Sequence, residues 1–199
     1  MPPTVPSAGL TARRPAFVMP PPLRKAVLTL HVAISVGWLG LDLGLLSLGT
    51  TALTTGDPEL LRASYLAMDV FGDTLIVPVS LGALLTGVLL CLGTPWGLVR
   101  YHWVLIKLVT TLAATTASIL ALRSHIGTAA AAVSKVPPAE LLSLDLGGVD
   151  RVLVIAPSVA LALYLLNVVL SVFKPFGRTP YGRRRPAGPR RAAATPPAP

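Results

Sequence analysis

Charged residues are scarce in this sequence, since Asp, Glu, Lys and Arg make up only 13% of its 199 residues. A soluble globular domain carries about 25% charged residues. Hydrophobic residues make up 53% of the chain and its mean hydropathy is +0.70. So few charges cannot cover an ordinary water-facing surface, which argues against a typical soluble domain.

Cysteine is nearly absent as well, because Cys91 is the only one in the chain. A single thiol excludes an intrachain disulfide, and it excludes a thiolate metal cluster, which needs several Cys or His ligands. Cys91 lies in an apolar run, where we interpret it as an inert buried thiol.

The short motifs of common catalytic sites are also missing. The sequence has no nucleotide-binding loop, no His-Glu-x-x-His and no Gly-x-Ser-x-Gly. No pair of residues suited to acid–base catalysis stands out beyond the acids that precede the second apolar run. We therefore do not expect an enzyme, and the residues alone indicate no cofactor.

Long apolar runs are what the sequence has in abundance. A membrane-spanning helix needs about 20 mainly apolar residues, and four stretches qualify: 26–48, 74–93, 103–122 and 152–173. They predict an all-α fold, a polytopic transmembrane four-helix bundle over residues 24–174. Residues 1–23 and 175–199 are rich in Pro or in Pro and Arg, and we expect disordered tails there.

Basic residues gather in the N-terminal arm, in the 94–103 connection and in the C-terminal tail. The connection over residues 49–73 differs, since it holds Arg62 against Asp57, Glu59, Asp69 and Asp73. In residues 123–151 basic and acidic residues balance. The positive-inside rule then predicts four crossings of a bacterial inner membrane with both termini in the cytoplasm.

Local signals refine these boundaries. Asp57-Pro58-Glu59 predicts a helix start, because Asp caps the helix, Pro suits its first position and Glu complements its dipole. The second helix should therefore begin near Pro58, outside the hydrocarbon. Trp96, Tyr101 and Trp103 are expected at the cytoplasmic interface. A short surface helix is compatible with residues 123–151, but the sequence does not specify it.

Each expected span carries its polar side chains on one face, at about 100° per residue. In the second span Asp69, Asp73, Ser80 and Gly87 align, and in the third Trp103, Lys107, Thr111, Ala114 and Ser118 align. Ionisable groups in hydrocarbon cost roughly 2.5–3.5 kcal/mol on insertion scales, so they normally face the interior of a bundle. The stripes predict a polar seam, with these candidate residues: His31, Asp42, Asp73, Lys107, Tyr164 and Asn167.

Several of these residues have a second interpretation. Lys107 could extend to the cytoplasmic headgroups, and Asp73 could be a solvated residue at the outer rim. His31 and Asp42 lie inside one apolar run, roughly 16 Å apart along the helix, so they should not touch. On the opposite face of that helix, Gly37, Gly40 and Gly44 are expected to allow close helix packing.

The run from His31 to Gly40, His-Val-Ala-Ile-Ser-Val-Gly-Trp-Leu-Gly, resembles the first helix of bacterial membrane families related to the copper-resistance D group. Residues 24–123, with Gly93-Thr-Pro-Trp-Gly-Leu and His102-Trp-Val-Leu-Ile-Lys, resemble actinobacterial conserved integral membrane proteins of unknown function. The resemblance implies a membrane bundle of four or more helices and a link to metal or haem handling. The sequence departs from a metal transporter because it lacks Met- and Cys-rich ligand sets.

Three functions remain open from the sequence. The first is a small transport, permeation or sensing component whose seam binds or conducts a proton or cation, with His31 the best candidate for a metal ligand. The second is a structural or assembly subunit that packs through the glycine face against a membrane partner or a second copy. The third is a haem-binding protein using His31 and His102. The basic tail favours anionic lipid headgroups over nucleic acid as its partner.

Overall fold

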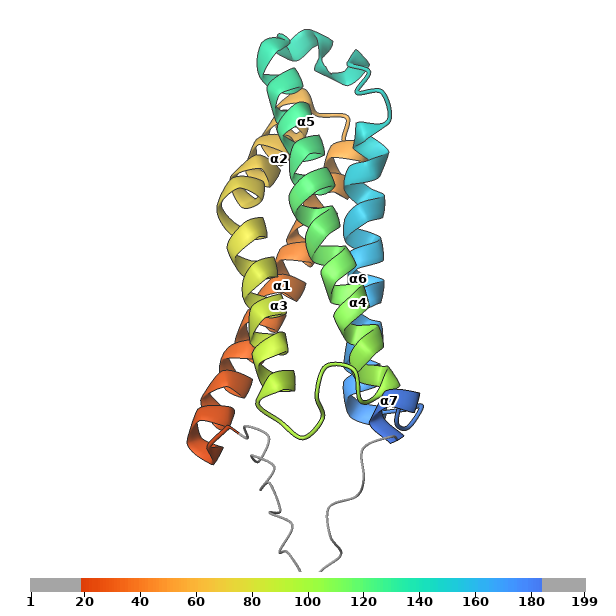
Figure 1. Cartoon of the computed structure of the whole chain (residues 1–199). Coiled ribbons are helices and arrows are strands. Elements are labelled where there is room, and N and C mark those ends of the chain that lie inside the picture. The colour runs from red at the N-terminus through yellow and green to blue at the C-terminus, as the bar shows by residue number, and fades with distance from the viewer. Residues whose placement is uncertain (1–18, 184–199) are drawn as a thin grey trace, which may run out of the picture.

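The computed structural model of the chain describes residues 19–183. Within this range four long apolar helices run up and down beside one another, which confirms the predicted all-α bundle and makes the chain a multi-pass membrane protein (Figure 1). The first is α1 (Pro21–Thr54) and the last is α6 (Val149–Phe173). The second consists of α2 (Pro58–Phe71), the π-helical η1 (Gly72–Ile76) and α3 (Val77–Leu92); the third of α4 (His102–Ala117), the π-helical η2 (Ser118–Leu122) and α5 (Arg123–Lys135).

The second helix begins where the sequence predicts. Pro58 is its first residue, and the Asp57 carboxylate accepts hydrogen bonds from the backbone N–H groups of Glu59 at 2.9 Å and Leu60 at 3.5 Å. Side-chain capping of this kind satisfies N–H groups that have no partner inside the helix. At α6, the Gly147-Gly148 pair, with φ of 60° and 85°, turns the chain into the first residue of the helix.

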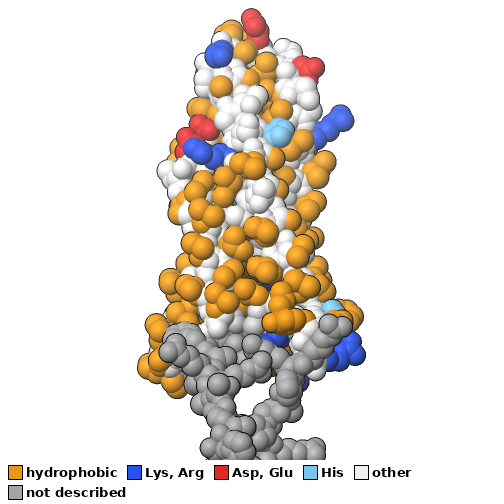
Figure 2. Space-filling model, in the orientation of Figure 1, with side chains coloured by type: hydrophobic (Ala, Val, Ile, Leu, Met, Phe, Trp, Pro, Cys, Tyr) orange, Lys and Arg blue, Asp and Glu red, His pale blue; other side chains and the backbone are white. Residues whose placement is uncertain are grey.

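An ion pair divides the bundle into two zones. Arg123 Nη2 lies 3.0 Å from Asp73 Oδ1, and both side chains are exposed. From this pair to Leu92 on α3 and to His102 on α4, each helix runs about 20 residues, roughly 30 Å, the thickness of the hydrocarbon layer. We call this part of the bundle the membrane section. Figure 2 shows mainly hydrophobic side chains along the middle of the molecule and most of the acidic ones near the top.

Beyond the ion pair lies what we call the head: α2, α5, the 3₁₀-helix η3 (Pro138–Ser143) and the adjoining ends of α1 and α6 (Figure 1). The head has a core of its own, in which all four long helices take part through Leu45, Met68, Ile126 and Leu153. Each of these is almost completely buried. Residues 123–151, for which the sequence specified no structure, thus form an extension of the third helix followed by η3.

The opposite end of the molecule ties both ends of the described chain to the 93–101 connection. The Met19 N–H donates to the Gly93 carbonyl at 3.0 Å. Thr179 donates from its backbone N–H to the Arg100 carbonyl at 2.9 Å and from its hydroxyl to the Val99 carbonyl at 2.7 Å. Gly182, in the short α7 (Pro180–Arg183), fits against the Arg100 backbone.

These contacts move the expected tail boundaries. Helix α1 begins at Pro21, inside the expected 1–23 arm, because Pro suits a first helical turn, where no N–H partner is needed. Residues 175–183, expected in the disordered tail, are held by the contacts of Thr179 and Gly182. The remainder of both expected tails, 1–18 and 184–199, lies outside the described residues.

Close helix packing uses other glycines than the predicted ones. Gly37 and Gly40 are exposed, and a Cβ atom built on either would meet nothing within 4 Å; at Gly44 the nearest atom is Phe71 Cε2, 3.5 Å away. At Gly49, by contrast, a Cβ atom would lie 2.8 Å from the Leu153 carbonyl oxygen. The tight contact between α1 and α6 is therefore at Gly49.

Candidate functional site

Asp42 is the most deeply buried ionisable side chain of the predicted seam. It lies on α1 one turn after Trp38, and both side chains point toward α6, with Asp42 only 4% exposed. The spacing of four residues places the two on one face of the helix. α1 thus carries a carboxyl group into the interior of the bundle, near the end of the membrane section that adjoins the head.

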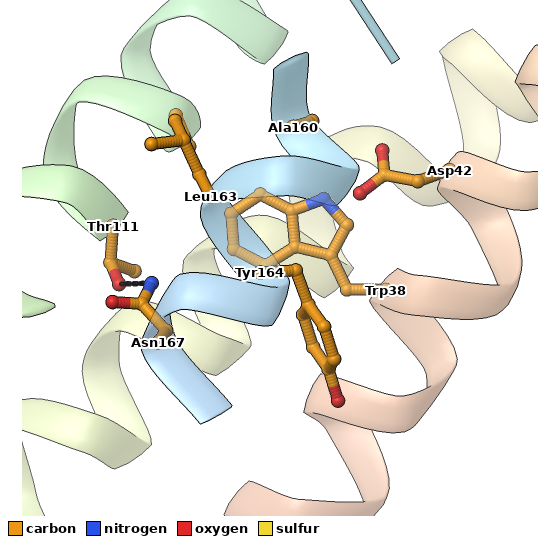
Figure 3. A pocket seen from close by; sticks show the side chains of 8 residues that line it. Trp38, Asp42, Thr111, Ala160, Leu163, Tyr164 and Asn167 are labelled. Carbon is orange, nitrogen blue, oxygen red and sulfur yellow. Dashed lines mark hydrogen bonds between the residues drawn. The ribbon is translucent and has the colours of Figure 1, made fainter. Parts of the chain in front are cut away.

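A small cavity adjoins Asp42 between α1, α4 and α6 (Figure 3). The space open to the centre of a water molecule is about 30 Å³, and one water needs about 10–15 Å³ on this measure. The cavity can therefore hold about two waters. Its polar walls come from Asp42, Trp38, Thr111, Tyr164 and Asn167, and its apolar walls from Ala114, Ala160 and Leu163.

The Asp42 carboxyl group has no hydrogen-bond or ion-pair partner among residues 19–183. Figure 3 shows it directed toward the nitrogen edge of the Trp38 indole, while the Tyr164 hydroxyl points away from it. An ionised carboxylate buried without a partner costs several kcal/mol. The geometry therefore suits a protonated acid, or one whose oxygens are satisfied by water in the cavity.

Below the cavity, α4 and α6 are joined by a continuous series of polar contacts. Asn167 Oδ1 lies 3.0 Å from the Thr110 hydroxyl, and Asn167 Nδ2 donates to the Thr111 hydroxyl at 3.4 Å. One turn further, the Lys107 ammonium donates to the Ser171 hydroxyl at 2.6 Å. That hydroxyl donates to the backbone carbonyl of Asn167 at 2.8 Å. Lys107 thus points into the bundle instead of extending toward the headgroups.

His31 lies at a similar depth to Lys107 but bonds to another helix. Its Nδ1 is 2.9 Å from the Thr86 hydroxyl, and that hydroxyl donates to the Gly82 carbonyl at 2.6 Å. Since the hydroxyl proton is used, His31 Nδ1–H is the donor of the pair. The ring lies over Gly87, where a Cβ atom would come 3.2 Å from His31 Cε1.

Asp73 does not join the predicted seam. Its side chain is 62% exposed and pairs with Arg123 on the neighbouring helix. The interpretation as a residue at the rim is the one that fits. The other five candidates line the interior, but as two groups: Asp42, Tyr164, Asn167 and Lys107 between α1, α4 and α6, and His31 between α1 and α3.

The structure offers no ligand set for a metal ion. No group of three or more His, Cys, Asp and Glu side chains lies close enough to hold one within residues 19–183. His102 donates from Nδ1 to the Phe176 carbonyl at 2.8 Å, on the exposed end of the bundle, while His31 faces Thr86. The two histidines face different partners and do not fit a shared haem.

Sequence reasoning did not single out Thr86 or Thr110, which anchor His31 and Asn167. Each adjoins a residue that the stripes did identify, Gly87 or Thr111. A predicted stripe that included two neighbouring residues at each turn of the helix would have included Thr86 and Thr110.

The chain was also compared with known proteins. No protein family, no curated protein and no solved structure matches it.

Proposed function

We propose that the protein is a small proton-handling component of a bacterial inner membrane, in which Asp42 takes up and releases a proton. The observation that carries this proposal is the Asp42 carboxyl group itself: 4% exposed, without a partner in the described chain, and beside a cavity with room for water. Ionisable residues inside membrane helices commonly mark proton or ion paths.

The contacts between α4 and α6 supply the continuation of the path. From Asp42, water in the cavity reaches Asn167 and Thr111, and the next turn holds Ser171 and Lys107. Hydroxyl groups and water both donate and accept, so a proton can pass along such a series. The path leads toward the end of the bundle that holds both ends of the described chain.

A proton suits this site better than a metal cation does. Ca²⁺ takes six to eight oxygen ligands and Mg²⁺ demands a near-ideal octahedral shell, whereas the cavity offers one carboxyl group with a few neutral oxygens. A proton needs no coordination shell, because it moves by exchange of hydrogen bonds.

We place the end with both termini in the cytoplasm. Arg24, Lys25, Arg100, Lys174 and Arg178 lie at that end, in accord with the positive-inside rule. Lys174 Nζ lies 5.2 Å from the centre of the Trp96 ring, and the Arg178 guanidinium lies 5.9 Å from that of Tyr101. Aromatic rings beside cations suit a surface of anionic lipid headgroups.

The proposal is tested with purified protein in liposomes that contain a pH-sensitive dye. A potassium gradient with valinomycin sets the membrane potential, and the rate of internal pH change measures proton flux. We expect flux above that of protein-free liposomes, and we expect Asp42→Asn to lose at least nine-tenths of it. Asp42→Asn keeps the size of the side chain and removes its titration.

Asp73→Asn is the matched control, since this carboxylate lies at a similar height but on the surface. It should retain the wild-type rate. Flux in Asp42→Asn equal to wild type, or wild-type flux no higher than that of empty liposomes, would contradict the proposal. An infrared difference spectrum provides a second readout, in which Asp42→Asn should remove the contribution of one buried carboxylic C=O group and leave those of the exposed acids.

A second candidate function is that of an assembly subunit, and it is favoured by the exposed backbone at Gly37 and Gly40. Small residues at this spacing let membrane helices approach closely. Under this alternative Gly40→Leu would abolish association with a membrane partner or second copy, as measured by cross-linking in the membrane, while Asp42→Asn would have no effect on the host complex.

A further inference from the structure

The head contains a second cavity, and none of the residues that line it lines the cavity beside Asp42. It lies between the end of α1, α2, the end of α5 and the segment from η3 to α6. The space open to the centre of a water molecule is about 190 Å³. An apolar cavity of about 150 Å³ holds benzene in a well-studied protein. The cavity in the head can therefore hold a body about the size of one ring.

The walls are chiefly leucine side chains from α2 and the η3–α6 segment, with Val133 of α5. Tyr65 of α2 also lines the cavity. The Tyr65 side chain is only 3% exposed, and its hydroxyl makes no hydrogen bond to any residue from 19 to 183. The Tyr65 hydroxyl group is therefore free to hydrogen-bond to a molecule in the cavity.

Two carboxylates complete the lining, Asp145 and Asp150, and no Lys or Arg is part of it. Asp145 accepts a hydrogen bond from the Gly147 N–H at 2.8 Å. Asp150 makes neither a side-chain hydrogen bond nor an ion pair within the described chain. The cavity therefore combines leucine side chains, one free hydroxyl group and two carboxylates with no basic side chain in the lining.

We propose that this cavity binds a small organic ammonium ion. Its apolar part, about the size of one ring, would fill the space between the leucines, while its ammonium group donates to Asp150 and to Tyr65, with Asp145 adding negative charge. A carboxylate that gains a charge-assisted hydrogen bond, and an apolar body removed from water, both favour such a complex. The site does not involve Asp42 and stands apart from the proposed proton path.

The test uses the full chain in nanodiscs of phosphatidylcholine and isothermal titration with 2-phenylethylammonium, with empty nanodiscs as the blank. We expect saturable binding of one ammonium ion per chain. Asp150→Asn should weaken it at least about tenfold, since hydrogen bonds to charged groups contribute most, and Tyr65→Phe should weaken it severalfold. 2-Phenylethanol, which has the ring but no charge, should bind at least about tenfold more weakly than the ammonium ion.

Asp57→Asn is the matched control, because Asp57 is an acid of the head that does not line the cavity; it should leave the affinity unchanged. Asp145→Asn serves as a second variant if Asp150→Asn does not yield folded protein. The proposal is overturned by binding no greater than in empty nanodiscs, by unchanged affinity in the Asp145 or Asp150 variants, or by equal affinity for the neutral alcohol.

Discussion

Gly49 lies where α1 meets the backbone of α6, and its hydrogen atom fills the space that any side chain would need. A methyl group there would lie 2.8 Å from the Leu153 carbonyl oxygen and 3.4 Å from Val154 Cγ2. Backbone atoms cannot move aside as a flexible side chain can. We expect Gly49→Ala to lower the free energy of unfolding by about 1–3 kcal/mol, measured by denaturant titration in detergent micelles.

Gly40→Ala is the control for that prediction, since nothing lies within 4 Å of the new atom. In a helix, Ala is favoured over Gly by about 1 kcal/mol, so this variant should be as stable as wild type or slightly more. If both variants had the same stability, the close contact at Gly49 would be contradicted.

The glycine pattern does not predict where α1 approaches α6 within the described bundle. Gly37, Gly40 and Gly44 have the spacing that helix pairs use, and Gly49 stands alone. The sequence shows which positions have no side chain. Which of these positions contacts a neighbouring helix depends on where α1 crosses α6. Asp42 and Asn167 were predictable as interior residues because a polar group inside an apolar run has few other places to go.

At the scale of a single element, α2 depends on its cap. The Asp57 carboxylate accepts from two backbone N–H groups at the start of the helix. Asp57→Ala leaves them to water, and we expect the free energy of unfolding to fall by about 1 kcal/mol. Asp57→Asn, which can still accept these bonds, should stay within a few tenths of wild type; thermal unfolding that did not separate the two variants would disprove the role of the cap.

The π-helical turn η1 alters one of the predicted polar stripes. In η1 each N–H bonds five residues back instead of four, so the chain turns less per residue than in an α-helix. Asp73 therefore lies on the surface although it aligns with the buried Ser80 on an ideal helix. In the third span the predicted stripe reaches into η2, where Ser118, its first residue, is buried, and Thr111 and Ala114 are placed toward the interior.

At the scale of the whole molecule, the four long apolar helices could be predicted from apolar length alone, whereas the helix start at Pro58 could be predicted from its capping residues. The head could not be predicted in this way, because α5 and η3 are polar and mixed in composition and lack the apolar pattern of a packed core. Their burial is set by contacts with α2 and α6, which lie far away in the sequence. Long-range packing of this kind leaves no periodic signal in the segment that it stabilises.

The orientation of the whole molecule can be tested with cysteine labelling. Ser143 lies exposed on η3 in the head, and Cys91 lies at the other end of the membrane section. In intact cells we expect a membrane-impermeant maleimide to label Cys91→Ala/Ser143→Cys and to leave the native chain unlabelled. Labelling of Ser143→Cys that required permeabilised cells would reverse the proposed orientation.

The core of the head has a consequence for the assembly of the protein during synthesis. It draws Leu45, Met68, Ile126 and Leu153 from the first, second, third and fourth long helices, so no product of translation that ends before α6 contains all four. α6 supplies the last of them, and it is inserted last. The head can therefore close only after the final crossing is made, and until then its apolar surfaces stay open to chaperones and proteases on the side of the membrane where it folds.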